Sequence, residues 1–205
     1  MAAILGKKVG MTQLFTEEGE SVPVTVIEAT PNRVTAIRSA EEDGYVAVQL
    51  GYGEVPERKL TKGRRGHLAK TGAPPLKRLR EFRDPEGEFE LGAEVTVESF
   101  EVGERVKVAA VAIGKGFQGT VKRHNFGRGP VSHGSHNVRA PGSIGASADP
   151  ARVFKGMKMP GRMGGKRVTQ RGLEVFRIDA EKHLLLLRGS VPGPRNGTVE
   201  VRSDG

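Results

Sequence analysis

The N-terminal quarter of the chain alternates apolar and polar residues in short runs that are typical of β-strands. Three such runs are separated by acidic or proline-containing turns and lie at residues 22–27 (VPVTVI), 33–38 (RVTAIR) and 45–50 (YVAVQL). A further strand is predicted at residues 11–15, after a turn at residues 6–10. The pattern predicts an antiparallel meander, and strands at this spacing usually close into a small sandwich or barrel.

The alternation stops between residues 57 and 85. Residues 61–71 predict a short basic helix that glycines weaken and that Pro74 and Pro75 end. The following residues, 76–82, have an apolar side chain at every third position. We therefore predict a small α/β insertion within the barrel.

Further strands are predicted in the second half of the chain, at residues 106–113 (VKVAAVAI), 173–178 (LEVFRI) and 184–187, with a last edge strand at 199–201. The predicted fold is mainly β: a small antiparallel barrel with the α/β insertion and a long irregular basic arm. The predicted segments are 1–56, 86–113 and 172–205 for the barrel, 57–85 for the insertion and 114–171 for the arm. The arm leaves and returns between two adjoining strands.

Residues 113–172, the basic segment, contain thirteen glycines and no apolar repeat at helical or alternating spacing. A segment with this pattern cannot close a hydrophobic core of its own. A loop of this length fits a folded domain only if it is functional or if a partner orders it.

The charges are segregated along the chain. The basic segment has twelve basic residues against one acid, and residues 58–83 have ten against Glu81 alone. The remaining residues contain 11 basic and 22 acidic side chains, so they are acidic although the whole chain has a net charge of +9. A focused positive charge favours binding to a polyanion, and nucleic acid is the expected partner.

Other partners and compartments are not favoured. The basic stretches have no apolar face at helical spacing for a lipid surface, and we find no bilayer-spanning run and no signal peptide. The absence of cysteine excludes disulfides and thiolate metal sites and fits a reducing compartment. We expect a cytoplasmic protein with no membrane partner and no small-molecule substrate.

Residues 114–119 (GKGFQG) match the glycine pattern of a dinucleotide-binding loop. The context fails, because the residues that follow are a poor helix and Arg139 stands where a ribose-binding acid is expected. The kinase pattern that Val121 completes fails for lack of the other kinase motifs. A nucleotide-using enzyme and a DNA architectural protein remain the rival hypotheses. Tight mononucleotide binding would favour the first, and equal affinity for duplex DNA and folded RNA the second.

Three histidines of the basic segment, His124, His133 and His136, form a weak zinc pattern without neighbouring acids. Contacts with nucleotides are the better reading of these side chains. Asp149 is the only acid available to its serines, so a catalytic triad is not expected. We expect no metal site and no catalytic residue. The aromatic and methionine side chains of the segment either stack on bases or pack locally, and both interpretations stay open; they are Phe117, Phe126, Phe154, Met157, Met159 and Met163.

The candidate RNA-binding residues fall into two groups. In the basic segment they are Lys115, Phe117, Gln118, Lys122, Arg123, His124, Phe126, Arg128, His133, His136, Arg139, Arg152, Lys155, Lys158, Arg162, Lys166, Arg167 and Arg171. In the insertion they are Arg58, Lys59, Lys62, Arg64, Arg65, His67, Lys70, Lys77, Arg78 and Arg80. Arginine gives bidentate phosphate contacts, and glycine lets the backbone approach phosphates closely.

Three motifs resemble the large-subunit ribosomal protein L-three family, bacterial type, and the resemblance extends over essentially the whole chain. They are residues 6–15 (GKKVGMTQLF), 114–145 (GKGFQGTVKRHNFGRGPVSHGSHNVRAPGSIG) and 155–169 (KGMKMPGRMGGKRVT). Two positions depart from the family pattern. Ala146 replaces a glutamine that some bacterial members methylate, so no modification is expected there, and Gly165 replaces an asparagine.

The resemblance implies a Greek-key, translation-factor-like barrel on the ribosome surface and an arm that runs toward the peptidyl transferase centre. It also implies a structural, non-enzymatic protein that binds large-subunit ribosomal RNA early in assembly, near the 3′ end of that RNA. Neighbouring large-subunit ribosomal proteins would be its other partners. No cofactor is implied, and magnesium would be present only through bound RNA.

Overall fold

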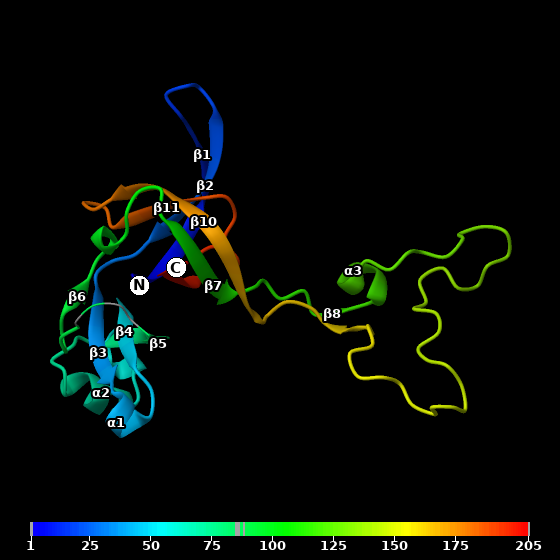
Figure 1. The fold of residues 1–205 in the computed structure, drawn as a ribbon, viewed down its shortest axis with the longest axis horizontal. Coiled ribbons are helices and arrows are strands. Elements are labelled where there is room, and N and C mark those ends of the chain that lie inside the picture. The colour runs from blue at the N-terminus through cyan, green and yellow to red at the C-terminus, as the bar shows by residue number, and fades with distance from the viewer. Residues whose placement is uncertain (1, 85–86, 88, 205) are drawn as a thin grey trace. The chain divides into compact units, whose positions relative to one another are not determined.

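The computed structural model describes residues 2–84, 87 and 89–204. The chain forms two compact units (Figure 1). Unit 1 consists of Met1–Ala112 and Arg167–Gly205, and unit 2 consists of Ile113–Lys166. Each unit is described separately below.

Six antiparallel strands of unit 1 close into a barrel in the order β1-β12-β7-β10-β11-β2. Their bounds are Ala3–Phe15 for β1, Ser21–Glu28 for β2, Arg105–Val111 for β7, Arg167–Asp179 for β10, Leu184–Arg188 for β11 and Thr198–Ser203 for β12. Because alternate residues of a strand face opposite sides, each strand gives the barrel one apolar inner row. That row includes the fully buried side chains of Ile4, Ile27, Val108, Leu185 and Leu187.

A second sheet of unit 1 has the strand order β5-β4-β3-β6. Its strands are β3 (Asn32–Arg38), β4 (Ala47–Glu54), β5 (Leu76–Arg83) and β6 (Glu94–Val95). The short helical elements of unit 1 are α1 (Ala40–Asp43), η1 (Glu57–Lys59), α2 (Lys62–Ala69) and η2 (Val97–Ser99). Thr61 caps α2, and Leu68 of α2 packs with Leu60 and Leu76 in a small core.

The barrel and the second sheet are joined by apolar contacts and by the buried side-chain amide of Asn32, which forms hydrogen bonds with the Leu5 backbone. Leu5 of β1 packs into the core of the second sheet with Val34, Leu50 and Phe82. Tyr52 belongs to the same core and donates a hydrogen bond to the Glu28 carbonyl over 3.1 Å. Burial raises the pKa of Tyr52 to about 12.

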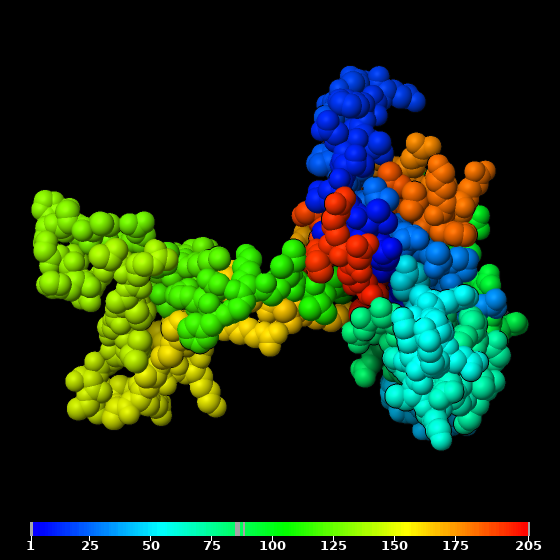
Figure 2. Space-filling model, turned by 180° about the vertical axis from the view of Figure 1, so that it is seen from behind, coloured from blue at the N-terminus to red at the C-terminus, as the bar shows by residue number. Residues whose placement is uncertain are grey.

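Unit 2 contains only short elements, which are β8 (Phe117–Gln118), α3 (Thr120–His124) and β9 (Gly161–Arg162). The structure describes every residue of this unit, and Thr120 is the only one that is buried. In Figure 2 the green and yellow limbs of unit 2 lie against each other near β8 and β9 and separate in the distal loop. Unit 2 therefore has no hydrophobic core.

Several sequence-based predictions are confirmed. The helix predicted at residues 61–71 is α2, and the strands predicted at 106–113, 173–178 and 184–187 correspond to β7, β10 and β11. Strands β7 and β10 pair with each other, so the basic segment does leave and return between adjoining strands.

Two predictions for the first 53 residues are wrong. Residues 6–10 are not a turn, because β1 continues through them with a register shift between Lys8 and Gly10. Gly6 instead allows β1 and β2 to lie close together, since a Cβ at this position would lie 2.6 Å from the Ile27 side chain. The strands predicted at 33–38 and 45–50 are β3 and β4, which pair in the second sheet and not in the barrel. Alternation reveals that a strand has one buried face, but not which core that face joins.

Two further strands, β12 and β10, also differ from the prediction. The strand predicted at 199–201 is β12, which pairs with both β1 and β7 and is therefore not an edge. Strand β10 begins at Arg167, earlier than the predicted boundary at residue 172. Residues 167–171 are all exposed and are held as a strand by pairing with β7, so no apolar alternation marks them. The remainder of the five-part division stays a prediction.

Candidate nucleic-acid interface

The base of unit 2 is a two-stranded ladder. Strands β8 and β9 pair Phe117 with Arg162, and two backbone hydrogen bonds of 2.9 Å extend the ladder from Lys115 N to Met163 O and from Met163 N to Gly116 O. Gly164 has a φ of +69°, and a Cβ at this position would collide with the Ile113 carbonyl. Glycine is required here because an L side chain fits neither the backbone angle nor the space.

Helix α3 is tied to the opposite limb of unit 2 by two side chains. The Arg123 Nη1 donates to the Met159 carbonyl over 2.6 Å, and the His124 Nε2 lies 3.0 Å from the same oxygen. Arg123 keeps further N–H groups for an external acceptor, since a guanidinium has five donors. His124 is half-buried and lies 6.1 Å from the Phe126 ring, so both have a local packing role.

The distal part of unit 2, residues 127–158, has little internal bonding. A backbone hydrogen bond of 3.0 Å joins Gly129 N to Val138 O, and two local ones of 3.3 Å join Ala151 N to Ser147 O and Met157 N to Phe154 O. Its candidate RNA-binding residues are all exposed: Arg128, His133, His136, Arg139, Arg152, Lys155 and Lys158. At the base of the unit, Lys115, Lys122, Arg162 and Lys166 are exposed too, and Gln118 is half-buried. The chain thus presents its cations and its unpaired backbone groups to solvent together.

Two aromatic side chains of unit 2 are available for stacking. Phe117 is 76% exposed and Phe154 is 55% exposed. The Arg152 guanidinium lies 5.4 Å from the centre of the Phe154 ring, which offers a combined cationic and aromatic surface. Met157 is exposed, whereas Met159 and Met163 are half-buried. The partial burial of Met159 and Met163 favours local packing for these two side chains, and base stacking by Phe154 and Met157 stays a prediction.

The insertion offers a second exposed basic surface. Its members are Arg58, Lys59, Lys62, Arg64, Arg65, Lys70, Lys77, Arg78 and Arg80 on η1, α2, β5 and their connections. The Arg64 Nη1 donates to the Lys77 carbonyl over 3.3 Å, which connects α2 to β5. The His67 Nε2 lies 2.7 Å from Gln49 Oε1 and is half-buried, so His67 has a structural role in this unit.

Two other candidate residues, Arg167 and Arg171, pair with carboxylates of unit 1. Arg167 forms an ion pair with Glu200. Arg171 donates to Asp204 over 2.8 Å, and Asp204 also accepts from the Gly172 N–H over 3.1 Å. The hydrogen bonds from Arg171 hold the pKa of the Asp204 carboxyl below its usual value. Arg171 therefore has a structural role in anchoring the end of the chain to β10.

The structure adds two basic residues to the candidate RNA-binding residues predicted from the sequence. Arg83 and Arg202 lie at a groove of unit 1 together with the predicted Arg80 and Arg167. Arg83 comes from β5 and Arg202 from β12, so no local motif could have joined them.

The described residues give no sign of a metal centre, since no group of three His, Cys, Asp or Glu side chains is placed to hold an ion among residues 2–84, 87 and 89–204. In the same described residues, no helix has the length and apolar character needed to span a membrane.

The sequence is similar to that of known ribosomal proteins. The family model for "Ribosomal protein L3" matches residues 87–184. The "Large ribosomal subunit protein uL3" of Prochlorococcus marinus (strain NATL1A) is 52% identical over 200 residues, which cover 97% of this chain and 92% of the relative. The protein of the same name from Synechococcus sp. (strain JA-3-3Ab) is 54% identical over 200 residues, covering 97% of this chain and 94% of the relative. The chain therefore belongs to the ribosomal protein L3 family, whose members are structural, non-enzymatic components of the large ribosomal subunit.

Proposed function

We propose that this protein binds large-subunit ribosomal RNA directly, through unit 2 and through the exposed basic surface of the insertion. One observation supports this most strongly. Unit 2 has ten basic residues against one acid, and among its residues only Thr120 is buried. Like charges at this density repel, and a unit without a core gains little from folding alone. An RNA surface neutralises the charge and offers acceptors for the exposed N–H groups.

The binding mechanism is coupled ordering. Unit 2 loses conformational entropy when it docks, and counterion release and phosphate hydrogen bonds offset that loss. If six to ten of its cations contact phosphates, the affinity falls by about 10³ to 10⁵ between 50 and 200 mM salt. The exposed arginines can give bidentate contacts to phosphates, because a guanidinium presents paired N–H donors to two oxygens at once.

Membership of the family supports the proposed place of the protein in the subunit. The protein binds early in assembly near the 3′ end of the RNA, next to other large-subunit proteins, in cytoplasmic ribosomes. Its basic arm supports the conformation of RNA at the peptidyl transferase centre, where RNA performs the chemistry. Magnesium enters only with the RNA, and no cofactor or small-molecule substrate takes part.

The barrel is proposed to be of the Greek-key, translation-factor-like type. The strand order β12-β7-β10-β11 supports this proposal. The successive barrel strands β7, β10 and β11 lie side by side, and the next barrel strand, β12, returns to lie beside β7.

The test is crosslinking in cells from photoreactive residues at Phe117 and Phe154, followed by sequencing of the attached RNA. Both side chains are exposed, so the probes can reach a partner. We expect crosslinks to cluster in large-subunit ribosomal RNA, while a matched probe at the exposed hairpin residue Glu17 gives a different pattern or none. Crosslinks spread over unrelated RNA, or equal affinity of the purified protein for duplex DNA, would contradict the proposal.

A further inference from the structure

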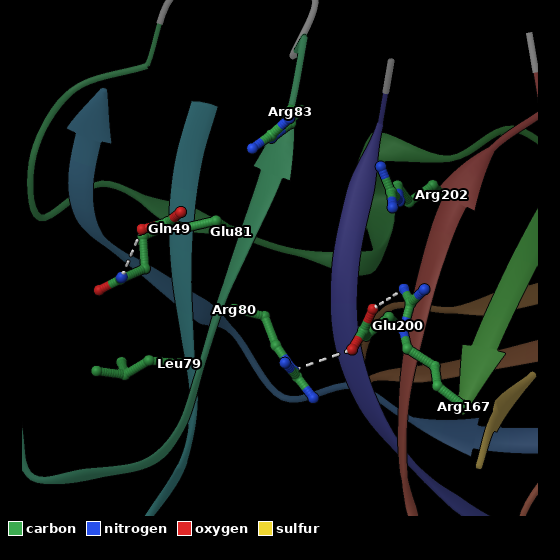
Figure 3. Close-up of a pocket in the computed structure, with 8 residues that line it drawn as sticks. All are labelled: Gln49, Leu79, Arg80, Glu81, Arg83, Arg167, Glu200 and Arg202. Atoms are coloured by element: carbon green, nitrogen blue, oxygen red, sulfur yellow. Dashed lines mark hydrogen bonds and ion pairs between the residues drawn. The ribbon is translucent and has the colours of Figure 1, made fainter. Parts of the chain in front are cut away.

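A groove of about 600 Å³ lies within unit 1, where the second sheet meets the barrel (Figure 3). The described residues that line it are Gln49, Leu79, Arg80, Glu81, Arg83, Arg167, Glu200 and Arg202. They come from β4, β5, β10 and β12, so the groove exists only because the two sheets pack together. Four of the eight are arginines.

Glu200 fixes two of these arginines. Its Oε1 lies 3.0 Å from the Arg80 Nε, and its Oε2 pairs with the Arg167 Nη2, as Figure 3 shows. The Glu200 side chain is only 13% exposed, whereas those of Arg80 and Arg167 are 56% and 45% exposed. One carboxylate thus positions two guanidinium groups that keep most of their N–H donors at the surface.

Aromatic rings fix the other two arginines. The Arg83 guanidinium lies 4.7 Å from the centre of the Tyr45 ring, and that of Arg202 lies 5.4 Å from the centre of the Phe82 ring. A cation–π contact uses none of the N–H donors of a guanidinium, so both arginines keep donors for a bidentate acceptor.

The remaining acid of the groove is already engaged. Glu81 accepts a hydrogen bond from the Tyr45 hydroxyl over 2.9 Å and one from the Gln49 amide over 3.2 Å. The hydrogen bond to Glu81 raises the pKa of Tyr45. Four arginines against two occupied carboxylates leave the groove with an excess of positive charge.

We propose that this groove is a preorganised site for the phosphodiester backbone of RNA, built from unit 1 alone. This inference rests on the proposed function and names a contact that does not depend on ordering of unit 2. Lys77 and Arg78 continue the basic surface along β5. An acidic protein is the less suitable occupant, because protein interfaces have apolar centres and Leu79 is the one aliphatic side chain among the described lining residues.

The first experiment compares the full chain with two double variants in titrations against a large-subunit ribosomal RNA fragment at several salt concentrations. Arg83→Gln with Arg202→Gln removes the two ring-held arginines. Arg177→Gln with Arg188→Gln removes the same charge from barrel positions that do not line the groove. Thermal unfolding confirms that each variant is folded, and Arg83→Lys with Arg202→Lys restores the charge.

We expect the groove variant to bind roughly a hundredfold more weakly, since two charge-assisted contacts are lost. Its slope of log affinity against log salt should be about two units smaller, and the lysine variant should recover part of that slope. The control variant should keep the slope of the unmodified protein. Equal slopes for the groove and control variants would contradict RNA binding by the groove, and they would leave the proposal that unit 2 binds RNA intact.

The second experiment observes the arginine Nε–H resonances of the full chain by NMR. A short RNA duplex should shift the Arg83 and Arg202 signals at micromolar concentration, and inorganic phosphate should do so only at millimolar concentration. If a polyglutamate peptide shifts these signals and the duplex does not, or if no probe shifts them, the proposal is wrong. This result is independent of whether the protein recognises ribosomal RNA, so it separates failure of the groove from failure of the proposed function.

Discussion

Asn32 shows at the scale of one residue how unit 1 is held together. Its side chain is fully buried, its Oδ1 accepts from the Leu5 N–H over 2.9 Å, and its Nδ2 donates to the carbonyls of Leu5 and Thr30 over 3.0 and 2.9 Å. The amide therefore satisfies buried backbone groups of β1 from the start of β3. Buried polar groups without hydrogen-bond partners destabilise a fold, so the Asn32 side chain contributes to stability mainly through these hydrogen bonds.

Replacing Asn32 with Ala should lower the free energy of unfolding by roughly 2–3 kcal/mol, because the Leu5 N–H and C=O lose their side-chain partner while remaining buried. Chemical denaturation measures this change. Asn137→Ala in unit 2 is the control, because Asn137 is exposed and should change stability little. A difference below about 0.5 kcal/mol for Asn32→Ala would show that water or a backbone shift replaces the amide.

Asp204 gives a prediction that depends on pH. Its carboxylate contacts Arg171, the Gly172 N–H and, over 3.7 Å, the Lys107 Nζ. Because its pKa is lower in the folded protein than the ordinary value of 3.8, the unfolded chain binds more protons in this range. The stabilisation is therefore fully present above the ordinary value and is lost as the pH falls through the folded pKa.

Asp204→Asn should lower the Tm at pH 7, and the difference from the unmodified protein should shrink below about pH 4 as Asp204 itself becomes protonated. Thermal unfolding at a series of pH values tests this. Glu17→Gln, at an exposed hairpin position, is the matched loss of one acid. A Tm difference for Asp204→Asn that persists unchanged into strong acid would rule out the carboxylate as its cause.

At the scale of elements, the sequence was informative wherever a strand has one apolar face. Strand β7 is predicted from the β-branched run that contains Val106 and Val108, and β11 from the short apolar run at residues 184–187; the structure buries Val108, Leu185 and Leu187. The first part of β10 was not predicted, because its residues from Arg167 are exposed and only pairing with β7 orders them. Pairing partners lie far apart in the sequence, so alternation carries no information about them.

Gly164 defines a prediction for the ladder at the base of unit 2. Gly164→Ala should disrupt the hydrogen bonds between Lys115 and Met163, because the new Cβ meets the Ile113 carbonyl and the φ of +69° is strained. Hydrogen exchange at the Lys115 and Met163 amides should become faster, with unit 1 unaffected. Gly127→Ala is the control, since nothing lies within 4 Å of a Cβ there. Unchanged exchange in Gly164→Ala would mean that the ladder is not formed in solution.

At the scale of the whole molecule, charge and packing are divided between the two units. Unit 1 contains the hydrophobic cores, and unit 2 contains cations and exposed backbone without a core. This division could be predicted from the sequence, because glycine content and charge are counted directly along the chain without knowledge of the fold. The groove at Arg83 and Arg202 could not be predicted, because its arginines become neighbours only when the second sheet packs on the barrel.

The most direct test of this account compares ribosomal RNA binding by the full chain with that of a variant in which an Asn-Gly turn replaces residues 112–166. Val111 and Arg167 are paired, so a short turn can join β7 to β10. Affinity is measured between 50 and 200 mM salt, and unfolding is followed for both proteins. We predict that the variant unfolds cooperatively with intact unit 1 but loses most of the affinity and most of the salt dependence. A folded variant that binds the RNA with the affinity and salt slope of the full chain would contradict the account.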